Sequence, residues 1–396
     1  MEAIAVPQSM QWLSRRIFDT DGHEMMPSQE WVKHFGPEAL TFAEASAIPD
    51  GEDRNHTGVP DYRGDVATIG PDIGSIKGAN APGATDPLRR LEVLDALGIR
   101  KQLMFPGSIG LYGFLLYLGK RPPGIPNAAV PDRAGALRWM EIYSEWAFGV
   151  ARTSDRLRPV LPLIGDTPEQ LYANARHLID NGIKGLWIAS GDLTGGCSPA
   201  HPDLDPLWAL MAESGTSGFL HGGGEGDFLA TREWRNAPAF TGYKSMAEFD
   251  FDPWSMSIYH LPSQNYLTTL VFGGVFERHP ALHFGVAEVG SHWVGPMMAS
   301  MDLLHRSFRR NEANPLTRQP SDYVRSNVRV SVLYYEPVDE WIEQFEGLED
   351  VLCFGTDYPH VEGGNDIIER FGKRLSRLGR DVSEKFFVTN GEALFG

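Results

Sequence analysis

The sequence is poor in cysteine, in long apolar runs and in positive charge. Its 396 residues include two cysteines, Cys197 and Cys353, which lie far apart and form no CxxC pair. We therefore expect no disulfide scaffold. We also expect no secretory signal or transmembrane span, and a cytoplasmic location. The formal net charge of −17 repels phosphate backbones and anionic lipids, so we expect neither a nucleic-acid nor a membrane partner.

Short apolar runs alternate with amphipathic stretches along the chain. Eight runs have the nearly continuous apolar character of strands buried on both faces: 16–21, 101–105, 158–163, 185–189, 217–221, 282–287, 328–333 and 351–355. Helices are predicted over 87–97, 134–153, 168–180 and 206–213, the third capped by Thr167. Alternation of this kind implies parallel strands with right-handed crossovers. The sequence therefore predicts an α/β fold, a single (β/α)₈ TIM barrel spanning residues 1–396.

Two long segments interrupt this alternation, at 43–86 after the first strand and at 223–266 after the fifth. The first is dense in Gly, Pro, Asp and Asn. The second is rich in aromatic residues, among them Phe228, Trp234, Phe240, Tyr243, Phe249, Phe251, Trp254 and Tyr259. Loops of this length are often lids or binding loops. We expect each insertion to be a lid or part of a dimer interface, in a homodimer or a larger homo-oligomer.

Polar residues at the end of the first predicted strand are candidate metal ligands, because the active sites of such barrels lie at the carboxyl ends of the strands. Alternation places Asp19, Asp21 and His23 on one face. Charged residues that point into a barrel are costly unless they bind something. We expect Asp21 and His23 to bind a divalent cation. The alternative is that Asp19 or Asp21 caps the following turn.

The fifth and eighth strands supply two further candidates. His221 follows an apolar run and precedes three glycines, where a backbone turns sharply beside a ligand. Asp357 follows the eighth strand and could bind a metal and also accept a proton. A buried core histidine and a simple turn are the respective alternatives. Together the strand ends predict one divalent ion held by Asp21, His23, His221 and Asp357.

The sixth strand ends on Glu288, and His292 follows four residues later. Both are candidate catalytic groups, although a salt bridge or a helix cap would also explain Glu288. His201 and His360 could bind and steady an oxyanion of a small-molecule substrate. In the second insertion, Trp254 could contact an apolar or aromatic substrate. Three arginines of the insertions, Arg63, Arg232 and Arg235, could clamp an anionic one, with Arg235 as our candidate.

Segments along the whole chain match a known family. They are DTDGH at 19–23, HPDLDPLW at 201–208, FLH at 219–221, GGVFERHP at 273–280 leading into 282–288, FGTDYPH at 354–360 and NGEALFG at 390–396. The sequence resembles the amidohydrolase-related group of the amidohydrolase superfamily, which includes aminocarboxymuconate-semialdehyde decarboxylase and the γ-resorcylate-type decarboxylases. The resemblance implies a metal held by first-strand residues, a fifth-strand His and an eighth-strand Asp. These correspond to Asp21, His23, His221 and Asp357.

The sequence departs from the family pattern at two strand ends. Its first strand carries Asp-x-His rather than the commoner His-x-His, which makes the site more anionic and suits Mn²⁺ or Zn²⁺. The sixth strand carries Glu288 where the decarboxylases have a histidine. Binuclear relatives bridge two metals with a lysine at the end of the fourth strand. Lys184 lies at the start of that strand, so one ion is expected.

Two reactions remain open. In the first, a metal-dependent hydrolase uses metal-activated water on an amide, ester, lactone or activated C–C bond. In the second, a metal-dependent carboxy-lyase removes CO₂ from an aromatic or unsaturated acid, and a protonated group delivers a proton to carbon. Glu288 favours hydrolysis, because a carboxylate can act as a general base but matches the decarboxylase histidine poorly.

Overall fold

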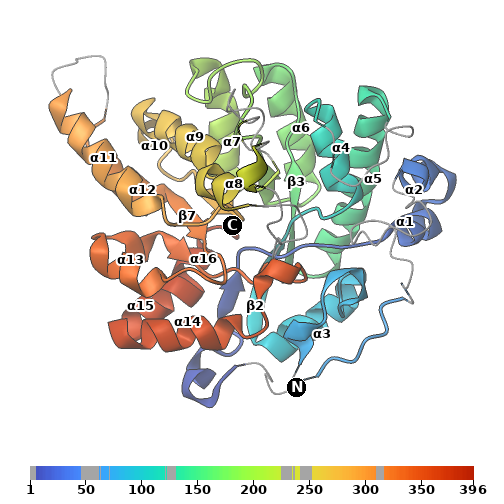
Figure 1. Ribbon diagram of the computed structural model, residues 1–396. Coiled ribbons are helices and arrows are strands. Elements are labelled where there is room, and N and C mark those ends of the chain that lie inside the picture. Colours follow the sequence, from blue (N-terminus) through green and yellow to red (C-terminus); the bar gives the residue numbers. More distant parts are fainter. Residues whose placement is uncertain are drawn as a thin grey trace.

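The computed structural model describes most of the 396-residue chain. The described residues are 6–45, 62, 64–70, 72–120, 122, 131–223, 234, 237–240, 252–308 and 316–396. Within them, helices surround a central group of strands (Figure 1). Among the described residues, no helix combines the length and the apolar character needed to cross a bilayer.

Eight parallel strands pair in chain order to form one sheet. They are β1 (Ile17–Asp19), β2 (Ile99–Met104), β3 (Leu157–Pro162), β4 (Gly185–Trp187), β5 (Ser217–His221), β6 (Phe284–Ala287), β7 (Val328–Ser331) and β8 (Leu352–Cys353). Backbone bonds then join the first and last strands. Thr20 N donates to Phe354 O over 3.0 Å, and Asp357 N donates to Asp21 O over 2.7 Å. All eight predicted strands and the (β/α)₈ arrangement are confirmed, and most of the observed strands are shorter than predicted.

Helices follow the strands in the order that the sequence predicts. They are α1 (Ser28–Phe35), α2 (Leu40–Ala45), α3 (Pro87–Leu97), α4 (Ile109–Tyr117), α5 (Arg133–Thr153), α6 (Pro168–Asp180), α7 (Asp205–Ser214), α8 (Pro253–Ile258), α9 (Leu261–Phe272), α10 (Val275–Arg278), α11 (Val294–Ser307), α12 (Pro320–Asn327), α13 (Val338–Gln344), α14 (Ile367–Leu375), α15 (Arg380–Glu384) and α16 (Asn390–Glu392). The Thr167 side chain accepts a hydrogen bond from Gln170 N, so the predicted cap of α6 is confirmed. The four predicted helices correspond to α3, α5, α6 and α7.

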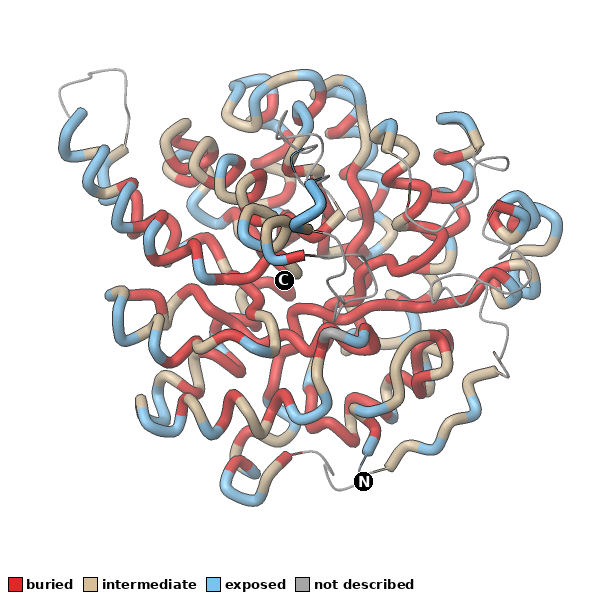
Figure 2. The backbone as a smooth tube through the Cα atoms, viewed as in Figure 1, coloured by how far each residue is buried: buried red, intermediate tan, exposed pale blue. Residues whose placement is uncertain are grey.

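Aromatic side chains of β5 and β6 pack against glycines on the neighbouring strand. The Phe219 ring lies on the side of Phe105, and the Phe284 ring lies on the side of α7 and α9. A Cβ on Gly285 of β6 would lie 2.5 Å from the Phe219 ring of β5, and one on Gly218 would lie 2.8 Å from the Phe284 ring. The absence of a side chain at each glycine leaves room for the aromatic ring of the neighbouring strand. Buried residues accordingly run through the central strands and the inner faces of the helices (Figure 2).

About half of the two predicted insertions falls outside the described residues. In the described part of 43–86 lie two short 3₁₀ turns, η3 (Ile73–Ser75) and η4 (Gly78–Asn80). In the described part of 223–266 lie η7 (Pro238–Phe240), α8 and the first half of α9. The lid and interface roles stay predictions.

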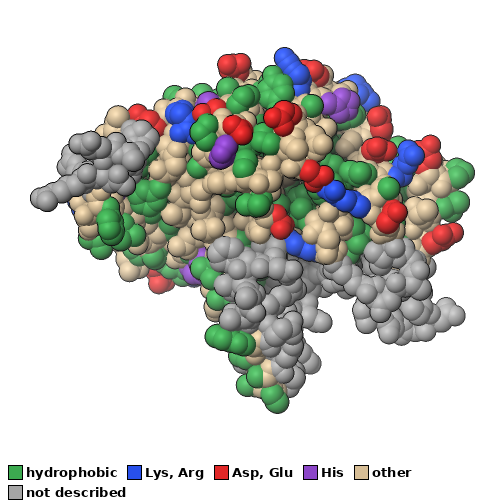
Figure 3. All heavy atoms as spheres, turned by 90° about the horizontal axis from the view of Figure 1, so that it is seen from above, with side chains coloured by type: hydrophobic (Ala, Val, Ile, Leu, Met, Phe, Trp, Pro, Cys, Tyr) green, Lys and Arg blue, Asp and Glu red, His purple; other side chains and the backbone are tan. Residues whose placement is uncertain are grey.

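On the face shown in Figure 3, acidic side chains are interspersed with basic ones and do not gather in one patch.

A buried arginine ties α3 to the ends of the first two strands. Arg90 is fully buried. Its guanidinium donates to Gly83 O (2.6 Å), to Gln102 Oε1 (2.9 Å) and to His23 O (2.6 Å). A planar fork can make these three divergent bonds at once, which the single ammonium of a lysine cannot do.

We therefore expect Arg90→Lys to lower the free energy of unfolding by about 2–4 kcal/mol, because buried acceptors lose their donors. Urea unfolding followed by circular dichroism measures this change. Arg100→Lys on β2 is the matched control. Its side chain is 54% exposed, and we expect a change below about 1 kcal/mol. Equal free energies of unfolding for the two variants would show that the Arg90 guanidinium contributes nothing to stability beyond its charge.

Candidate metal centre

Six ionisable side chains meet at the carboxyl ends of four strands. Asp21 and His23 follow β1, His221 ends β5, Glu288 follows β6, and Asp357 and His360 follow β8. All six are buried or nearly so, and they fall into two overlapping groups of possible metal ligands that share His23. The structure thus brings together all four predicted metal ligands, together with Glu288 and His360.

The first group has the spacing of ligands around one ion. Asp21 Oδ1 lies 3.4 Å from His23 Nε2 and 3.5 Å from His221 Nε2. These three atoms are buried and have no hydrogen-bond partner among the described residues. Ligands at tetrahedral positions about 2.1 Å from a metal lie about 3.4 Å from one another. Unpartnered buried atoms at this spacing fit a divalent cation.

The second group lies on the other side of His23. His360 Nδ1 and Asp357 Oδ1 share a hydrogen bond of 2.9 Å, and His360 Nδ1 lies 3.4 Å from Glu288 Oε1. The ring of His360 stacks on that of His23, with the ring centres 3.8 Å apart. Asp357 Oδ1 is 3.5 Å from His23 Nε2, and Asp357 Oδ2 is buried without a hydrogen-bond partner in the described part of the chain. Asp357 therefore lies between the two groups.

Unusual backbone conformations and glycines bring the carboxylates close together. Glu288 and Asp357 have φ values of 60° and 53°, in the left-handed region that residues other than glycine seldom adopt. A Cβ on Gly222 would lie 2.4 Å from Glu288 Oε2, and one on Gly355 would lie 2.7 Å from Asp21 Cβ. Both glycines thus leave room that the acidic side chains occupy.

Asp19, unlike Asp21, uses both of its carboxylate oxygens in hydrogen bonds within the barrel. It accepts bonds from Thr356 N (2.8 Å), Thr356 Oγ1 (2.6 Å) and Gln102 Nε2 (2.7 Å). Burial raises the pKa of Asp19 to about 6 against the opposing effect of these bonds. Its oxygens are therefore used to fasten β1 to β2 and to the segment after β8, which positions Asp21.

The charges of the cluster perturb one another strongly. Burial lowers the pKa of His23 to about 4, and the positive charge of His360 adds to this effect. Burial also acts to lower the pKa of His221, but the nearby Glu288 and Asp21 raise it to about 9. Burial raises the pKa of Asp357 well above its ordinary value, and the carboxylates of Asp21 and Glu288 reinforce the shift.

Aromatic side chains wall the cluster on the side of β2 and β4. The rings of Phe105 and Trp187 lie 4.2 Å and 5.1 Å from that of His221, measured between ring centres. The Tyr259 hydroxyl accepts a bond from Gly223 N over 3.1 Å. The sequence analysis missed Phe105 and Trp187 because it searched strand ends for ionisable residues. Their positions directly after β2 and at the end of β4 were a usable signal.

His292 belongs to neither group of possible metal ligands. Its ring contacts those of His260 and Trp341, with centres 4.7 Å and 6.5 Å apart. It lines a cavity of about 270 Å³ that Met256 and Glu336 also border. The structure therefore places this candidate catalytic residue in a neighbouring pocket.

The remaining predicted substrate-binding residues lie apart from the cluster or outside the described residues. The His201 side chain is 48% exposed and accepts a bond from Asp203 N at the start of the short turn before α7. Trp254 lies on α8, where its ring faces that of Phe240 at 6.3 Å. Arg63, Arg232 and Arg235 lie outside the described residues.

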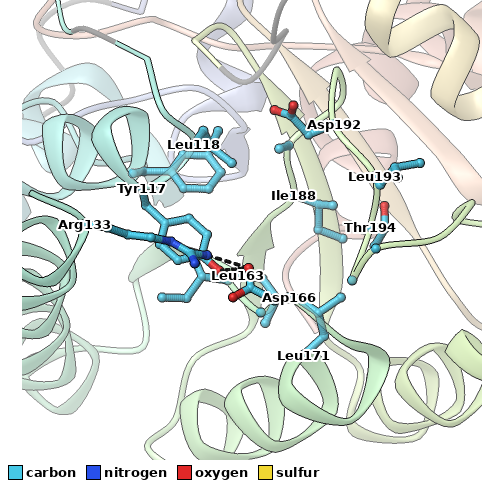
Figure 4. A pocket seen from close by; sticks show the side chains of 16 residues that line it. Tyr117, Leu118, Arg133, Leu163, Asp166, Leu171, Ile188, Asp192, Leu193 and Thr194 are labelled. Atoms are coloured by element: carbon cyan, nitrogen blue, oxygen red, sulfur yellow. Dashed lines mark hydrogen bonds and ion pairs between the residues drawn. The ribbon is translucent and has the colours of Figure 1, made fainter.

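A second cavity, of about 280 Å³, opens beyond the ends of β3 and β4 (Figure 4). Arg133 lies over the Tyr117 ring and pairs with Asp166 there. Phe114 lines this cavity and packs on Trp187 at 4.9 Å, and Trp187 in turn packs on His221. The rings of Phe114 and Trp187 therefore lie between this cavity and His221. Within the cavity, the Arg133 guanidinium forms its ion pair with Asp166.

Comparisons with known proteins agree with this architecture. A family model described as Amidohydrolase matches residues 133–396. An amidohydrolase of Mycobacterium avium subsp. paratuberculosis is 18% identical, with a TM-score of 0.65 and 96% and 99% of the two chains covered. The 2,6-dihydroxybenzoate decarboxylase of Rhizobium is 16% identical, with a TM-score of 0.59 and coverage of 96% and 98%.

A third solved structure carries a metal and an aromatic acid. It is the 5-carboxyvanillate decarboxylase of Novosphingobium aromaticivorans with manganese and 4-hydroxy-3-methoxy-5-nitrobenzoic acid. It is 17% identical, with a TM-score of 0.57 and 96% and 95% of the two chains covered. At these identities the likeness shows the fold. No curated protein sequence matches the chain.

Glu336 holds the loop that carries Glu288 and His292. It accepts bonds from Ser291 N (2.8 Å), Ser291 Oγ (2.9 Å) and Leu333 N (2.9 Å). Burial raises its pKa from 4.5 to about 7 despite these bonds. Between these pH values the folded state binds a proton that the unfolded chain has lost. This carboxyl therefore lowers stability as the pH rises through that range.

We expect Glu336→Gln to remove this dependence, which amounts to about 3 kcal/mol across the interval. The free energy of unfolding of the metal-free wild type should fall relative to the variant between pH about 4.5 and about 7. Urea unfolding of both proteins at several pH values measures the difference. Parallel stability curves would show that Glu336 ionises at its ordinary pKa in the folded chain.

Proposed function

Because the chain belongs to the amidohydrolase family, we propose that it is a metal-dependent enzyme that removes CO₂ from an aromatic or unsaturated carboxylic acid without oxidation. The observation that carries this proposal is the buried cluster of three imidazoles and three carboxylates at the barrel mouth. Decarboxylases of 2,6-dihydroxybenzoate and 5-carboxyvanillate share the fold and support the choice of reaction.

Decarboxylation replaces hydrolysis, which the sequence analysis favours, as the leading hypothesis. The argument for hydrolysis depends on Glu288 as a general base. In the structure Glu288 lies 3.4 Å from His221 Nδ1 and 3.4 Å from His360 Nδ1, so both of its oxygens face imidazoles. A histidine on the β8 loop thus lies beside the strand-six carboxylate. This pair supplies the imidazole that a strand-six histidine supplies in decarboxylases of the family.

The resident ion would be held by Asp21, His23 and His221, with Asp357 as the fourth ligand. Their unpartnered buried atoms fit such an ion. We propose Mn²⁺ ahead of Zn²⁺, because carboxylate-rich sites suit harder cations and a solved relative contains manganese. When bound, the ion supplies positive charge that would hold a substrate carboxylate and an adjacent oxygen.

The chain's own residues would hold the aromatic ring and the proton. Phe105 and Trp187 offer an apolar wall beside His221 and exclude water on that side. The hydrogen-bonded pair of His360 Nδ1 and Asp357 Oδ1 holds a proton between the two atoms. Transfer of this proton to the ring carbon accompanies cleavage of the bond to the carboxylate. The electron pair of that bond forms the new C–H bond, and CO₂ leaves.

The ligand assignment makes a first prediction. We expect His221→Asn to weaken Mn²⁺ binding at least about 100-fold, because loss of a ligand should cost no less than loss of an outer-shell partner. His292→Asn is the matched control and should bind Mn²⁺ like the wild type. Equilibrium dialysis with metal analysis measures both, and circular dichroism checks folding. Wild-type affinity in His221→Asn would remove this residue from the ligand set.

The reaction makes a second prediction. The Mn²⁺-loaded enzyme should release CO₂ from at least one member of a panel of hydroxybenzoates with a hydroxyl next to the carboxylate. In D₂O the product should carry one deuterium at the carbon that lost CO₂, and removal of the metal by a chelator should abolish turnover. Cleavage of amides, esters or lactones without any CO₂ release from the acid panel would support hydrolysis and contradict the proposal.

A further inference from the structure

The cluster contains more ligand atoms than one resident ion needs. Three carboxylates, those of Asp21, Glu288 and Asp357, lie within it. Among the described residues, no lysine or arginine forms an ion pair with any of the three. Arg90, the buried arginine next to His23, uses its guanidinium on Gly83, Gln102 and His23 oxygens. One divalent ion therefore leaves one negative charge, which either the proton of the His360–Asp357 pair or a second cation can balance.

The ligand atoms also divide in space into two groups. Asp21, His23 and His221 form one group, while Glu288, Asp357 and His360 gather with His23 in the other. Within the second group Glu288 Oε1 and His360 Nδ1 lie 3.4 Å apart, the spacing found in the first group. Asp357 belongs to this second group, and its Oδ2 is buried without a hydrogen-bond partner among the described residues. A carboxylate has two oxygens and can bridge two ions.

We propose that Glu288, His360 and Asp357 form a second divalent-cation site beside the resident ion, and that an ion bound there inhibits the enzyme. Inhibition follows because a nitrogen or oxygen that binds a cation cannot also carry a proton. The second ion would thus occupy His360 Nδ1 and Asp357 Oδ1, the atoms that hold the catalytic proton. The inhibition, unlike the site itself, rests on the proposed decarboxylation.

The second site should bind more weakly than the first. The Glu288 side chain is 15% exposed, whereas those of Asp21 and His221 are each 3% exposed. Greater contact with solvent weakens the attraction between charges. In addition, the positive charge of the resident ion would repel an ion in the second site. We therefore expect the two ions to bind in sequence, with affinities at least about 10-fold apart.

Mn²⁺ titration of the metal-free full-length chain tests the site without any substrate. Equilibrium dialysis should give one ion per chain at low Mn²⁺ and two at high Mn²⁺. Glu288→Gln and His360→Asn should each stop at one, while the control His292→Asn should reach two. In the wild type, electron paramagnetic resonance should show spin coupling between neighbouring Mn²⁺ ions as the second one binds. A wild-type plateau at one ion, or a second ion that survives both substitutions, overturns the site.

Turnover of the wild type tests the inhibition. The rate of CO₂ release should rise as the first ion binds and fall at least about 10-fold as the second binds. Two bound ions with an undiminished rate would overturn the inhibitory role, while the proposal of a second metal site would still stand. No CO₂ release at any Mn²⁺ concentration would overturn the proposed function and with it the inhibition, while the ion counts would still decide the second site.

Discussion

The candidate centre depends on the hydrogen bonds that close the barrel between its first and last strands. Asp357 N donates to Asp21 O, and Thr20 N donates to Phe354 O. These bonds fix two acidic residues, 336 positions apart in the chain, on adjoining backbone segments. Asp19 strengthens the same junction through Thr356. The candidate metal ligands of β1 and β8 are thus positioned by backbone hydrogen bonds.

That closure has an electrostatic cost. It buries Asp21, Asp357 and Glu288 close together, and an isolated carboxylate in such a place is strongly disfavoured. A conformational cost adds to the electrostatic one, because Glu288 and Asp357 have positive φ values. Strained carboxylates around unpartnered imidazole nitrogens are stable together when cations or protons balance their charge. Ion binding and protonation are therefore two ways to balance the buried negative charge. His360 Nδ1, which lies beside Glu288 and Asp357, could take either a cation or a proton.

The sequence predicts this site well where side chains follow directly from strand ends. Period-two alternation placed Asp21 and His23 together, and the glycines after His221 indicated a ligand-bearing turn. The sequence could not show that the Asp19 oxygens accept hydrogen bonds from Gln102 and Thr356, because those bonds join segments far apart in the chain. Nor could it show that His292 turns towards His260 and Trp341, since this depends on how Glu336 holds the loop after β6.

The strand-six carboxylate shows why one substitution in a motif does not fix the reaction. A histidine at this position would supply an imidazole from β6. Here Glu288 comes from β6 and His360 from the loop after β8, yet the two side chains meet 3.4 Å apart at the same cluster. The barrel mouth collects side chains from every strand, so an imidazole needed at one point in space can come from another loop. What constrains the chemistry of the candidate centre is the set of groups that it brings together, and this set contains both a carboxylate and an imidazole beside the candidate metal ligands.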